Sequence, residues 1–346
     1  MNDHRTKRAS LRDVAKLAGV SIATASRVLS GADHPVTEET RLAVVSAAER
    51  LSFQPNRLAR ALVTSRSGVV GAIVHDISDP YFGDIVRGLE DGLGRDDYRI
   101  LVASSDRDPQ KELEYLNALI GQQVDGIVLA ASSLADRSYE NEIVETVARY
   151  RKQGGSVVLL SEHVIRGPKV VFDNVGATRD MVTHLVKKGH RRIAYLAGPD
   201  NLVIAKTRLD GYRQGLDGSG IAYDDSLVGD GGFSIDEGSA AALRLLEANE
   251  FTALFAANDL MAIGATRALM DRGIRIPEDI SIAGFDDIIL AEYGPVRLTT
   301  IRMPTHEMGL KGAELLLALL RGEDPTDARV EGSIVERESV GPPSST

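Results

Sequence analysis

The chain has 346 residues, 43% of them hydrophobic, which is enough for two or three domains with sizeable cores. It contains no cysteine, so disulfides, zinc–thiolate sites and thiol nucleophiles are excluded. The formal net charge is -10, but residues 1–66 hold 11 Lys and Arg against 6 Asp and Glu, a net of +5. A basic segment on an acidic body is typical of a nucleic-acid-binding module, although a solvated basic tail would produce the same asymmetry.

Neither a membrane span nor a secretory leader is predicted. No apolar run approaches the roughly 20 residues that cross a bilayer. Residues 1–10 are polar and lack the apolar stretch of a signal peptide. We therefore expect a cytoplasmic protein with no membrane partner.

Residues 11–31 are predicted to form two short helices joined by a turn. Ser10 and Asp13 have the spacing of a capping pair ahead of the first helix. Gly19 would end that helix, since glycine reaches backbone angles that other residues avoid, and Ser21 would cap the second helix. The apolar residues expected to face inward are Val14, Leu17, Ala18, Val28 and Leu29. This pattern is typical of a helix-turn-helix, whose second helix enters the major groove of DNA, although an ordinary helical hairpin would share it.

The second helix carries side chains suited to DNA. Ile22 and Ala23 lie at its N-terminal end, where a recognition helix meets base edges. Thr24 and Ser26 offer hydroxyls to phosphate oxygens, and the planar guanidinium of Arg27 can contact guanine O6 and N7 together. The candidate DNA contacts in this helix are Ser21, Ile22, Ala23, Thr24, Ser26 and Arg27.

A third helix and a short basic segment follow. Thr37, with two glutamates after it, would begin a helix that runs to about residue 51 and closes a three-helix headpiece. Its expected inward positions are Leu42, Val45, Ala48 and Leu51. Residues 55–62 are basic and rich in Ala and Leu, and are too few for a helix that is stable alone. A segment that folds only when something holds it is a candidate switch, with a plain connector as the alternative.

From residue 69 onward, short apolar runs alternate with amphipathic helices. Strands are expected at 69–74, 100–103, 126–129, 157–160, 170–172, 193–197, 253–256, 280–283 and 298–301. Helices are expected near 82–93, 110–121, 140–153, 177–188, 205–216, 235–247, 260–272 and 306–320. This alternation predicts parallel sheets covered on both faces, and its length of some 280 residues predicts two α/β lobes.

Polar and aromatic residues follow several of these strands. Ligands of parallel α/β folds bind beyond the carboxyl ends of the strands, here in the cleft between the lobes. Acids, an amide, an arginine and aromatic rings at those ends suit a polyhydroxylated ligand, through hydrogen bonds and stacking. The candidates are Asp79, Tyr81, Phe82, Glu162, Arg208, Phe233, Asn258 and Asp286. Each has a structural alternative, because an Asp can cap a helix, a Phe can belong to the core and an Arg can form a salt bridge.

Motifs of enzymes and metal sites are missing from the sequence. It has no P-loop, no nucleophile elbow and no dinucleotide-binding glycine pattern after a strand. Its seven histidines lack the spacing of metal ligands. We therefore predict no catalytic residue, no metal site and no cofactor, and an α/β enzyme is a remote alternative.

A series of motifs runs in order along the chain. In the N-terminal part they occupy 13–15, 18–21, 24–29, 55–56 and 59–62. In the remainder they occupy 124–127, 258–262, 277–281, 284–287 and 298–301. Together, over almost the full length, they resemble the LacI/GalR family of bacterial transcription regulators.

The resemblance implies a homodimer that reads a palindromic operator. Ile22, Ala23 and Arg27 match base-reading positions, and Leu62 matches a leucine that wedges into the minor groove at a central CG step. The DNA contacts that it implies in the hinge segment are Asn56, Arg57, Ala59 and Leu62. The strand-end residues that match sugar-contacting positions of the family are Asp79, Phe82, Arg208, Phe233, Asn258 and Asp286. The pair Ser161-Glu162 replaces a common Asp-Arg pair, at a position where the ligand would be recognised.

The expected fold is an all-α helix-turn-helix headpiece followed by a two-lobed α/β domain of the periplasmic-binding-protein type, with parallel doubly wound sheets. The expected boundaries are 1–54 for the headpiece, 55–67 for the hinge helix and linker, and 68–346 for the effector-binding and dimerisation domain. Within that domain, the N-lobe would span about 68–165 and 295–323, and the C-lobe about 166–294 and 324–341.

The expected function is that of a ligand-responsive transcriptional regulator, above all a repressor of carbohydrate-related genes. Its partners would be operator DNA, a second copy of the chain and a small sugar or sugar derivative that acts allosterically. A sugar-binding sensory protein without a DNA function is the alternative.

Overall fold

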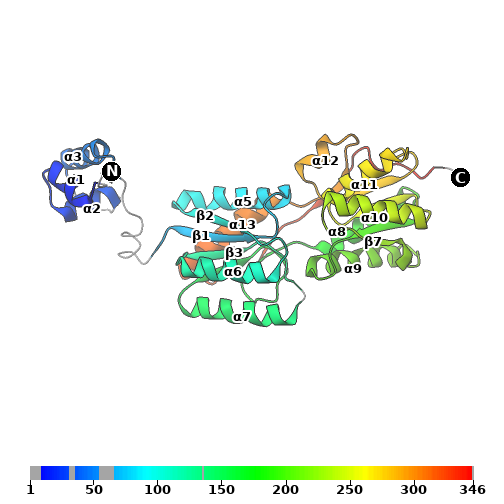
Figure 1. Ribbon diagram of the computed structural model, residues 1–346, viewed down its shortest axis with the longest axis horizontal. Helices are drawn as coiled ribbons and strands as arrows, with labels where there is room; N and C mark the ends of the chain where they lie inside the picture. Colours follow the sequence, from blue (N-terminus) through cyan, green and yellow to red (C-terminus); the bar gives the residue numbers. More distant parts are fainter. Residues whose placement is uncertain (1–8, 31–35, 54–65, 135, 345–346) are drawn as a thin grey trace, which may run out of the picture. The chain divides into compact units, whose positions relative to one another are not determined.

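The computed structural model describes residues 9–30, 36–53, 66–134 and 136–344. It divides into two compact units, residues 1–67 and residues 68–346, which we call the helical unit and the α/β unit. Each unit has its own hydrophobic core, and Figure 1 shows the elements of both.

The described part of the helical unit contains α1 (Leu11–Leu17), α2 (Ile22–Ser30) and α3 (Glu38–Arg50). The Ser10 side chain accepts a hydrogen bond from the backbone of Asp13, whose carboxylate accepts one from the Ser10 backbone at 2.9 Å, so the predicted capping pair is confirmed. Gly19 has a φ of +66°, a conformation that favours glycine, and it forms the turn between α1 and α2. The local structure is therefore that of the predicted helix-turn-helix.

The core of the helical unit differs in part from the predicted one. Its buried residues are Val14, Ala15, Ala25, Val28, Val44, Ala47 and Ala48. Leu17, Leu42 and Val45 are 42%, 61% and 39% exposed, so the prediction that they face inward is wrong. The cause is that α3 carries two overlapping apolar stripes, and the stripe through Val44 and Ala47 packs against α1 and α2. Periodicity alone cannot choose between two such stripes.

Two parallel sheets form the framework of the α/β unit. The first contains β1 (Val69–Val74), β2 (Arg99–Ser104), β3 (Gly126–Leu129) and β4 (Ser156–Leu159), in the order β2-β1-β3-β4. The second contains β6 (Ile193–Ala197), β7 (Val228–Asp230), β8 (Ala253–Ala256), β9 (Ser281–Asp286), β10 (Thr299–Arg302) and β12 (Ser333–Val335). Its order is β12-β10-β9-β8-β6-β7, and β12 alone among these strands is antiparallel to its neighbour. A separate short pair joins β5 (Val170–Val171) to β11 (Ala328–Arg329).

Helices cover both faces of each sheet, as the sequence pattern predicts (Figure 1). Around the first sheet lie α5 (Pro80–Leu93) and α13 (Thr305–Leu320) on one face, and α6 (Pro109–Gly121) and α7 (Arg137–Lys152) on the other. Around the second sheet lie α8 (Asn174–Lys187) and α9 (Val203–Gly218) on one face, and α10 (Ile235–Ala248) and α11 (Asp259–Asp271) on the other. Within the described ranges, no helix is long and apolar enough to cross a membrane.

The return of the chain to the first lobe differs from the predicted boundary. The sequence places that return at about residue 295, but β10 pairs with β9 of the second sheet, with Thr299 opposite Ala283. The chain therefore returns only after β10, at the start of α13, and the predicted boundary is wrong. The reason is that an apolar strand does not encode which sheet it joins, because strand pairing depends on contacts distant in sequence.

A few short elements were not among those predicted. They are the strands β7, β11 and β12, the helix α12 (Ile289–Tyr293), and single 3₁₀ turns at Gly94–Asp96 and Asp225–Leu227. Strand β5 was predicted, but its pairing with β11 was not. Strand β7 consists of Val228, Gly229 and Asp230 at the edge of its sheet, and none of the three is fully buried. So short and polar a segment has no periodicity to detect.

Candidate functional site

The N-terminal part of α2 presents the residues proposed for DNA. The Ser21 hydroxyl accepts a hydrogen bond from the backbone of Thr24 at 3.0 Å and lies 2.8 Å from the Thr24 hydroxyl, so it caps the helix. Ile22, Ala23, Ser26 and Arg27 are exposed, while Thr24 is half-buried. Ala25 and Val28, on the opposite side, are buried in the helical core. The helix therefore keeps its outer face, including an Ile22 that is 45% exposed, available for a partner.

The proposed hinge contacts cannot be placed in the same way. Asn56, Arg57, Ala59 and Leu62 lie outside the described residues.

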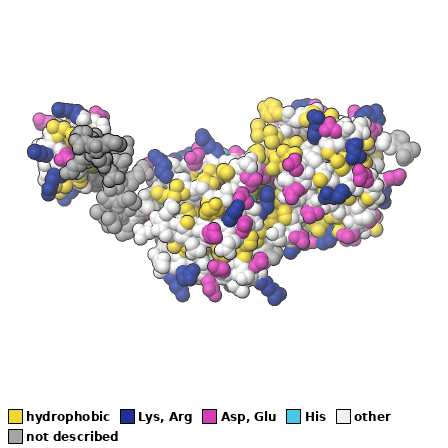
Figure 2. Space-filling model, in the orientation of Figure 1, with side chains coloured by type: hydrophobic (Ala, Val, Ile, Leu, Met, Phe, Trp, Pro, Cys, Tyr) yellow, Lys and Arg dark blue, Asp and Glu magenta, His cyan; other side chains and the backbone are white. Residues whose placement is uncertain are grey.

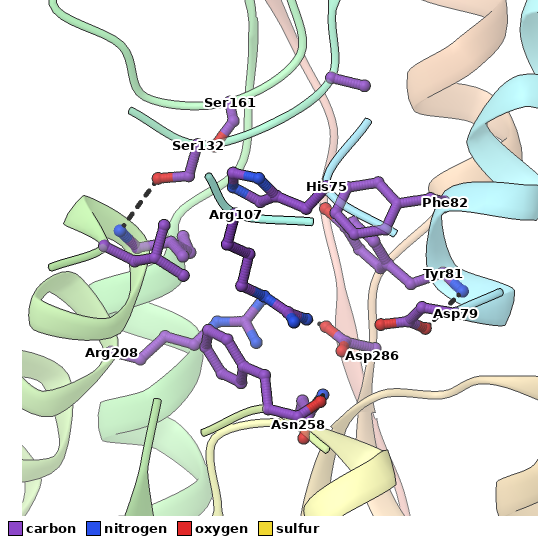
Figure 3. Close-up of a pocket in the computed structure, with 14 residues that line it drawn as sticks. His75, Asp79, Tyr81, Phe82, Arg107, Ser132, Ser161, Arg208, Asn258 and Asp286 are labelled. Carbon is purple, nitrogen blue, oxygen red and sulfur yellow. Dashed lines mark hydrogen bonds and ion pairs between the residues drawn. The ribbon is translucent and has the colours of Figure 1, made fainter. Parts of the chain in front are cut away.

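A pocket lies between the two lobes of the α/β unit, at the carboxyl ends of the strands of both sheets. Its volume is about 470 Å³, counting the part that opens to solvent. Figure 3 shows how its side chains converge from both lobes. The lining residues are His75, Asp79, Tyr81, Phe82, Arg107, Ala130, Ser132, Ser161, Leu202, Ile204, Arg208, Phe233, Asn258 and Asp286. A pocket of mixed polarity at this position in an α/β fold suits a small polar ligand.

Seven of the eight strand-end candidates line this pocket, and Glu162 does not. Glu162 borders an adjoining cavity of about 290 Å³, where its carboxylate accepts a hydrogen bond from the Lys169 ammonium at 3.2 Å. The two cavities share Tyr81, Ser161 and Ile204 in their walls. Glu162 therefore lies beside the main pocket and not in its wall, and its contact with the effector stays a prediction.

An ion pair between Arg208 and Asp286 lies at the second-lobe side of the pocket. The Nη2 of Arg208 donates to Asp286 Oδ1 at 3.1 Å, and both side chains are almost completely buried. Arg208 also donates to the Asn174 side chain at 3.1 Å and to the carbonyl of Ala257, and its guanidinium carbon lies 3.6 Å from the centre of the Phe285 ring. With so many partners, the guanidinium is held in one orientation, and it neutralises the Asp286 charge.

Burial controls the ionisation of the two pocket carboxyls. It raises the pKa of Asp286 to about 7, against the opposing effect of Arg208 and with a smaller contribution from the nearby Asp79. Burial also raises the pKa of Asp79, while the hydrogen bond from the backbone of Tyr81, at 3.0 Å, counteracts the rise. Asp286 can therefore exchange a proton near neutral pH, and either carboxyl can form hydrogen bonds with ligand hydroxyls.

The amide of Asn258 is fixed by the start of α11. Its Oδ1 accepts from the Met261 backbone at 3.0 Å as the cap of the helix, and its Nδ2 donates to the Phe233 carbonyl at 3.3 Å. The Phe233 ring lines the pocket, and the backbone of Phe233 has a φ of +67°. Asn258 therefore caps α11 and lines the pocket with the same side chain, and the capping role was not predicted for it.

Sequence reasoning missed part of the wall. The pocket residues that it did not single out are His75, Arg107, Ala130, Ser132, Leu202 and Ile204, whereas Ser161 was named together with Glu162. His75 follows β1, Arg107 follows β2, and Ser132 and Ser161 follow β3 and β4, so every strand of the first sheet contributes at its carboxyl end. The signal that could have found these residues is their position directly after a strand. This signal was used for only some of the strands.

Comparison with known proteins agrees with both units. Residues 10–56 match the family described as bacterial regulatory proteins, lacI family, and residues 182–340 match the periplasmic binding protein-like domain. Over 343 residues the chain is 36% identical to the transcriptional regulator CelR of Thermobifida fusca, covering 97% of this chain and 99% of that protein. The chain belongs to the LacI family.

Other LacI-family proteins are also similar to this chain over almost its full length. The transcriptional regulator GalR of Escherichia coli is 36% identical over 342 residues, 97% of each chain. A structure of the Lac repressor dimer bound to operator and the anti-inducer ONPF has a TM-score of 0.85 at 28% identity, covering 96% of this chain and 99% of that one. A structure of a CelR–cellobiose complex has a TM-score of 0.71 at 34% identity, covering 96% and 100%. These relatives are transcriptional regulators and not enzymes, and the LacI-family chain described here is a DNA-binding transcriptional regulator.

Proposed function

We propose that the protein represses carbohydrate-related genes by binding a palindromic operator as a homodimer, under the control of a small sugar or sugar derivative. The observation that carries this proposal is the combination, in one chain, of an exposed recognition helix and an interlobe pocket lined by carboxyls, an amide and aromatic rings. Since operator DNA lies in the bacterial cytoplasm, the proposal also places the protein there.

The roles of the DNA-facing residues follow from their positions on α2. Ile22 and Ala23, exposed at the N-terminal end, would meet base edges in the major groove. Arg27, one turn further on and exposed, would bind guanine, while Ser21, Thr24 and Ser26 would position the helix on phosphates. Asn56, Arg57, Ala59 and Leu62 would add minor-groove and backbone contacts from the hinge, with Leu62 as the wedge.

The effector would bind in the interlobe pocket. Asp79, Asn258 and Asp286 offer hydrogen-bond partners to hydroxyl groups, and the rings of Phe82 and Phe233 offer apolar faces to a sugar ring. The cellobiose named for the CelR structure supports a carbohydrate ligand for a pocket of this type.

Two exposed apolar surfaces would form the dimer interface. The first is the edge strand β2, where Leu101 and Val102 are 40% and 41% exposed. The second is α12, over which hydrophobic side chains gather in Figure 2; Ile289 is 62% and Tyr293 77% exposed. Unpaired edge strands and exposed apolar patches are the surfaces that a second chain covers.

A series of ion pairs that begins next to Asp286 links the pocket to α12. Asp287, the neighbour of Asp286, forms ion pairs with Arg302 at 2.6 Å and Arg337 at 2.7 Å, and Arg337 also pairs with Glu292 of α12 at 2.7 Å. A ligand that changes the angle between the lobes would thereby change the dimer interface and the spacing of the two hinge segments. A coupling of about 1–3 kcal/mol, or roughly 5–150-fold in operator affinity, is sufficient for regulation.

The proposal is tested by selecting DNA from a random duplex library with the full-length protein. We expect enrichment of a palindrome, and binding of the labelled palindrome in fluorescence anisotropy should weaken steeply with salt, with a log–log slope of about -0.9 per phosphate contact. A scrambled duplex of the same composition is the control. Equal affinity for both duplexes contradicts the proposal, and sugar binding without any DNA enrichment supports the sensory-protein alternative.

A further inference from the structure

Arg107 enters the interlobe pocket from the loop between β2 and α6, and the ends of that loop are firmly held. The backbone N–H of Asp106 donates to the His75 carbonyl at 2.7 Å, and the Asp106 carboxylate pairs with Lys111 at 2.7 Å. Asp108 caps α6 through the backbone of Gln110 at 2.8 Å. Figure 3 shows the Arg107 side chain extending from this loop into the pocket.

The backbone of this loop is strained to present Arg107. Asp106 and Arg107 have φ angles of 54° and 59°, in the left-handed region that non-glycine residues avoid. Phe233, across the pocket in the second lobe, has a φ of 67°. Strain that persists at residues facing one another across a cavity is characteristic of ligand clamps.

The guanidinium of Arg107 has no anionic partner among the described residues. Its Nε is buried without a hydrogen-bond acceptor, and no ion pair or hydrogen bond of the side chain is formed within the described ranges. Its closest specific contact is with the Phe233 ring, whose centre lies 5.9 Å from the guanidinium carbon. Arg107 as a whole is half-buried, but its buried Nε is a donor without an acceptor, which is costly, and a ligand can supply the acceptor.

The other charged groups of the pocket compensate Arg107 only in part. Asp286 is paired with Arg208. Asp79 forms no salt bridge with Arg107; burial raises the pKa of its carboxyl, and the Arg107 charge opposes part of that rise. His75 is 3% exposed with both ring nitrogens unpartnered, and burial, together with the Arg107 charge, lowers its pKa to about 3, so the ring stays neutral. The backbone of Ser132 approaches this ring without completing a hydrogen bond.

The pocket brings two kinds of polar group together. Asp79, Asn258 and the Asp286–Arg208 pair suit hydroxyl groups. The Arg107 guanidinium is a cationic hydrogen-bond donor beside the Phe233 ring, and Figure 3 shows its side chain extending past His75 toward Asp286.

We propose that the effector is an acidic sugar, whose single carboxylate or phosphate group is bound by Arg107. This inference rests on the proposed function, because it names the class of ligand for the pocket through which that function would be controlled. A guanidinium matches the two oxygens of a carboxylate or phosphate in a bidentate arrangement, which gives it preference over neutral groups. The contact between Arg107 of the first lobe and Phe233 of the second means that the bound anion would also act on the angle between the lobes.

The test is isothermal titration calorimetry of the full-length protein with matched ligand sets. Glucose is compared with glucuronate and glucose 6-phosphate, and galactose with galacturonate and galactose 6-phosphate. We expect at least one acid to bind about 10-fold or more tightly than its neutral parent, which corresponds to a hydrogen bond to a charged group. The uronates and the phosphates separate the two sources of the anionic group.

Arg107→Gln removes the charge and keeps the length of the side chain. It should abolish the preference, measured in each variant as the ratio of the affinity for the acid to the affinity for its neutral parent, and Arg107→Lys should retain part of that ratio. Arg95→Gln, on the exposed surface of the same lobe, is the matched control and should behave as the wild type. A preference that survives in Arg107→Gln overturns the inference.

Binding of neutral sugars at least as tightly as of their acids, or binding of no acid in the panel, also overturns the inference. Operator binding measured on the same protein samples reports separately on the proposed function. If operator binding and a response to a neutral sugar are both found, the function stands and only the acidic effector fails. If selected DNA is not bound either, the proposed function itself fails.

Discussion

Glu112 on α6 is a buried carboxyl. Its replacement by glutamine should change how the free energy of unfolding depends on pH, by an amount that follows from its pKa. The side chain is 0% exposed, and neither of its oxygens has a hydrogen-bond partner within the described residues. Burial raises its pKa from 4.5 to about 7; the nearby Tyr139 hydroxyl lowers the pKa by a smaller amount, without completing a hydrogen bond. The folded protein therefore holds this proton more tightly than the unfolded chain does.

The sign and size of the effect follow from this difference in pKa. Between pH 4.5 and about 7, the folded state keeps a proton that the unfolded state has lost, so the free energy of unfolding falls as the pH rises. At 1.36 kcal/mol for each pH unit, the loss amounts to about 3 kcal/mol and is complete above pH 7. Glu112→Gln cannot ionise and lacks this loss, so relative to the wild type it should gain about 3 kcal/mol between pH 5 and pH 8.

The assay is thermal unfolding of the α/β unit in the full-length protein, followed by circular dichroism at both pH values. For a unit of this size, the difference corresponds to a relative shift in Tm of about 6 °C. Any constant cost of burying the amide cancels, because only the change between the two pH values is compared. Glu114→Gln, an exposed neighbour on the same helix, is the control and should show no such change. An equal Tm difference between Glu112→Gln and wild type at pH 5 and pH 8 would refute the reasoning.

Three further predictions concern function. Arg27→Ala should weaken operator binding by about 1–3 kcal/mol and relax specificity at one base pair per half-site, and an unchanged binding profile in a base-substitution series would exclude a base-reading role. Leu62→Ala should reduce DNA bending and specific affinity while the calorimetric affinity for the effector stays the same; normal bending in a gel-shift phasing assay would count against the wedge. Asp286→Ala should abolish the effector response and spare operator binding, and it should destabilise the α/β unit by about 3–5 kcal/mol because Arg208 is left buried without its counter-charge. Asp210→Ala, exposed on α9, is its control, and an effector response retained in Asp286→Ala would remove that residue from the site.

Much of the fold is determined by local patterns. The capping pair at Ser10 and the glycine turn at Gly19 are decided by backbone hydrogen bonding and steric freedom within a few residues, so the sequence predicts them correctly. The same holds for the alternation of apolar strands and amphipathic helices, which predicts two covered parallel sheets. Because parallel strands present their carboxyl ends at one edge, the sequence also brings together Asp79, Arg208 and Asp286 as candidate pocket residues.

Tertiary structure decided everything that depends on a choice between equivalent local patterns. It selected the Val44 stripe of α3 over the Leu42 stripe, because only contact with α1 and α2 distinguishes them. It placed β10 in the second sheet, since an apolar strand is compatible with either sheet. It turned Glu162 toward Lys169 and Arg107 into the pocket, because neither an ion pair within an irregular loop nor a left-handed backbone at an arginine has a signature in the sequence. The position of the pocket could thus be derived from the sequence, whereas its charge balance required the folded chain.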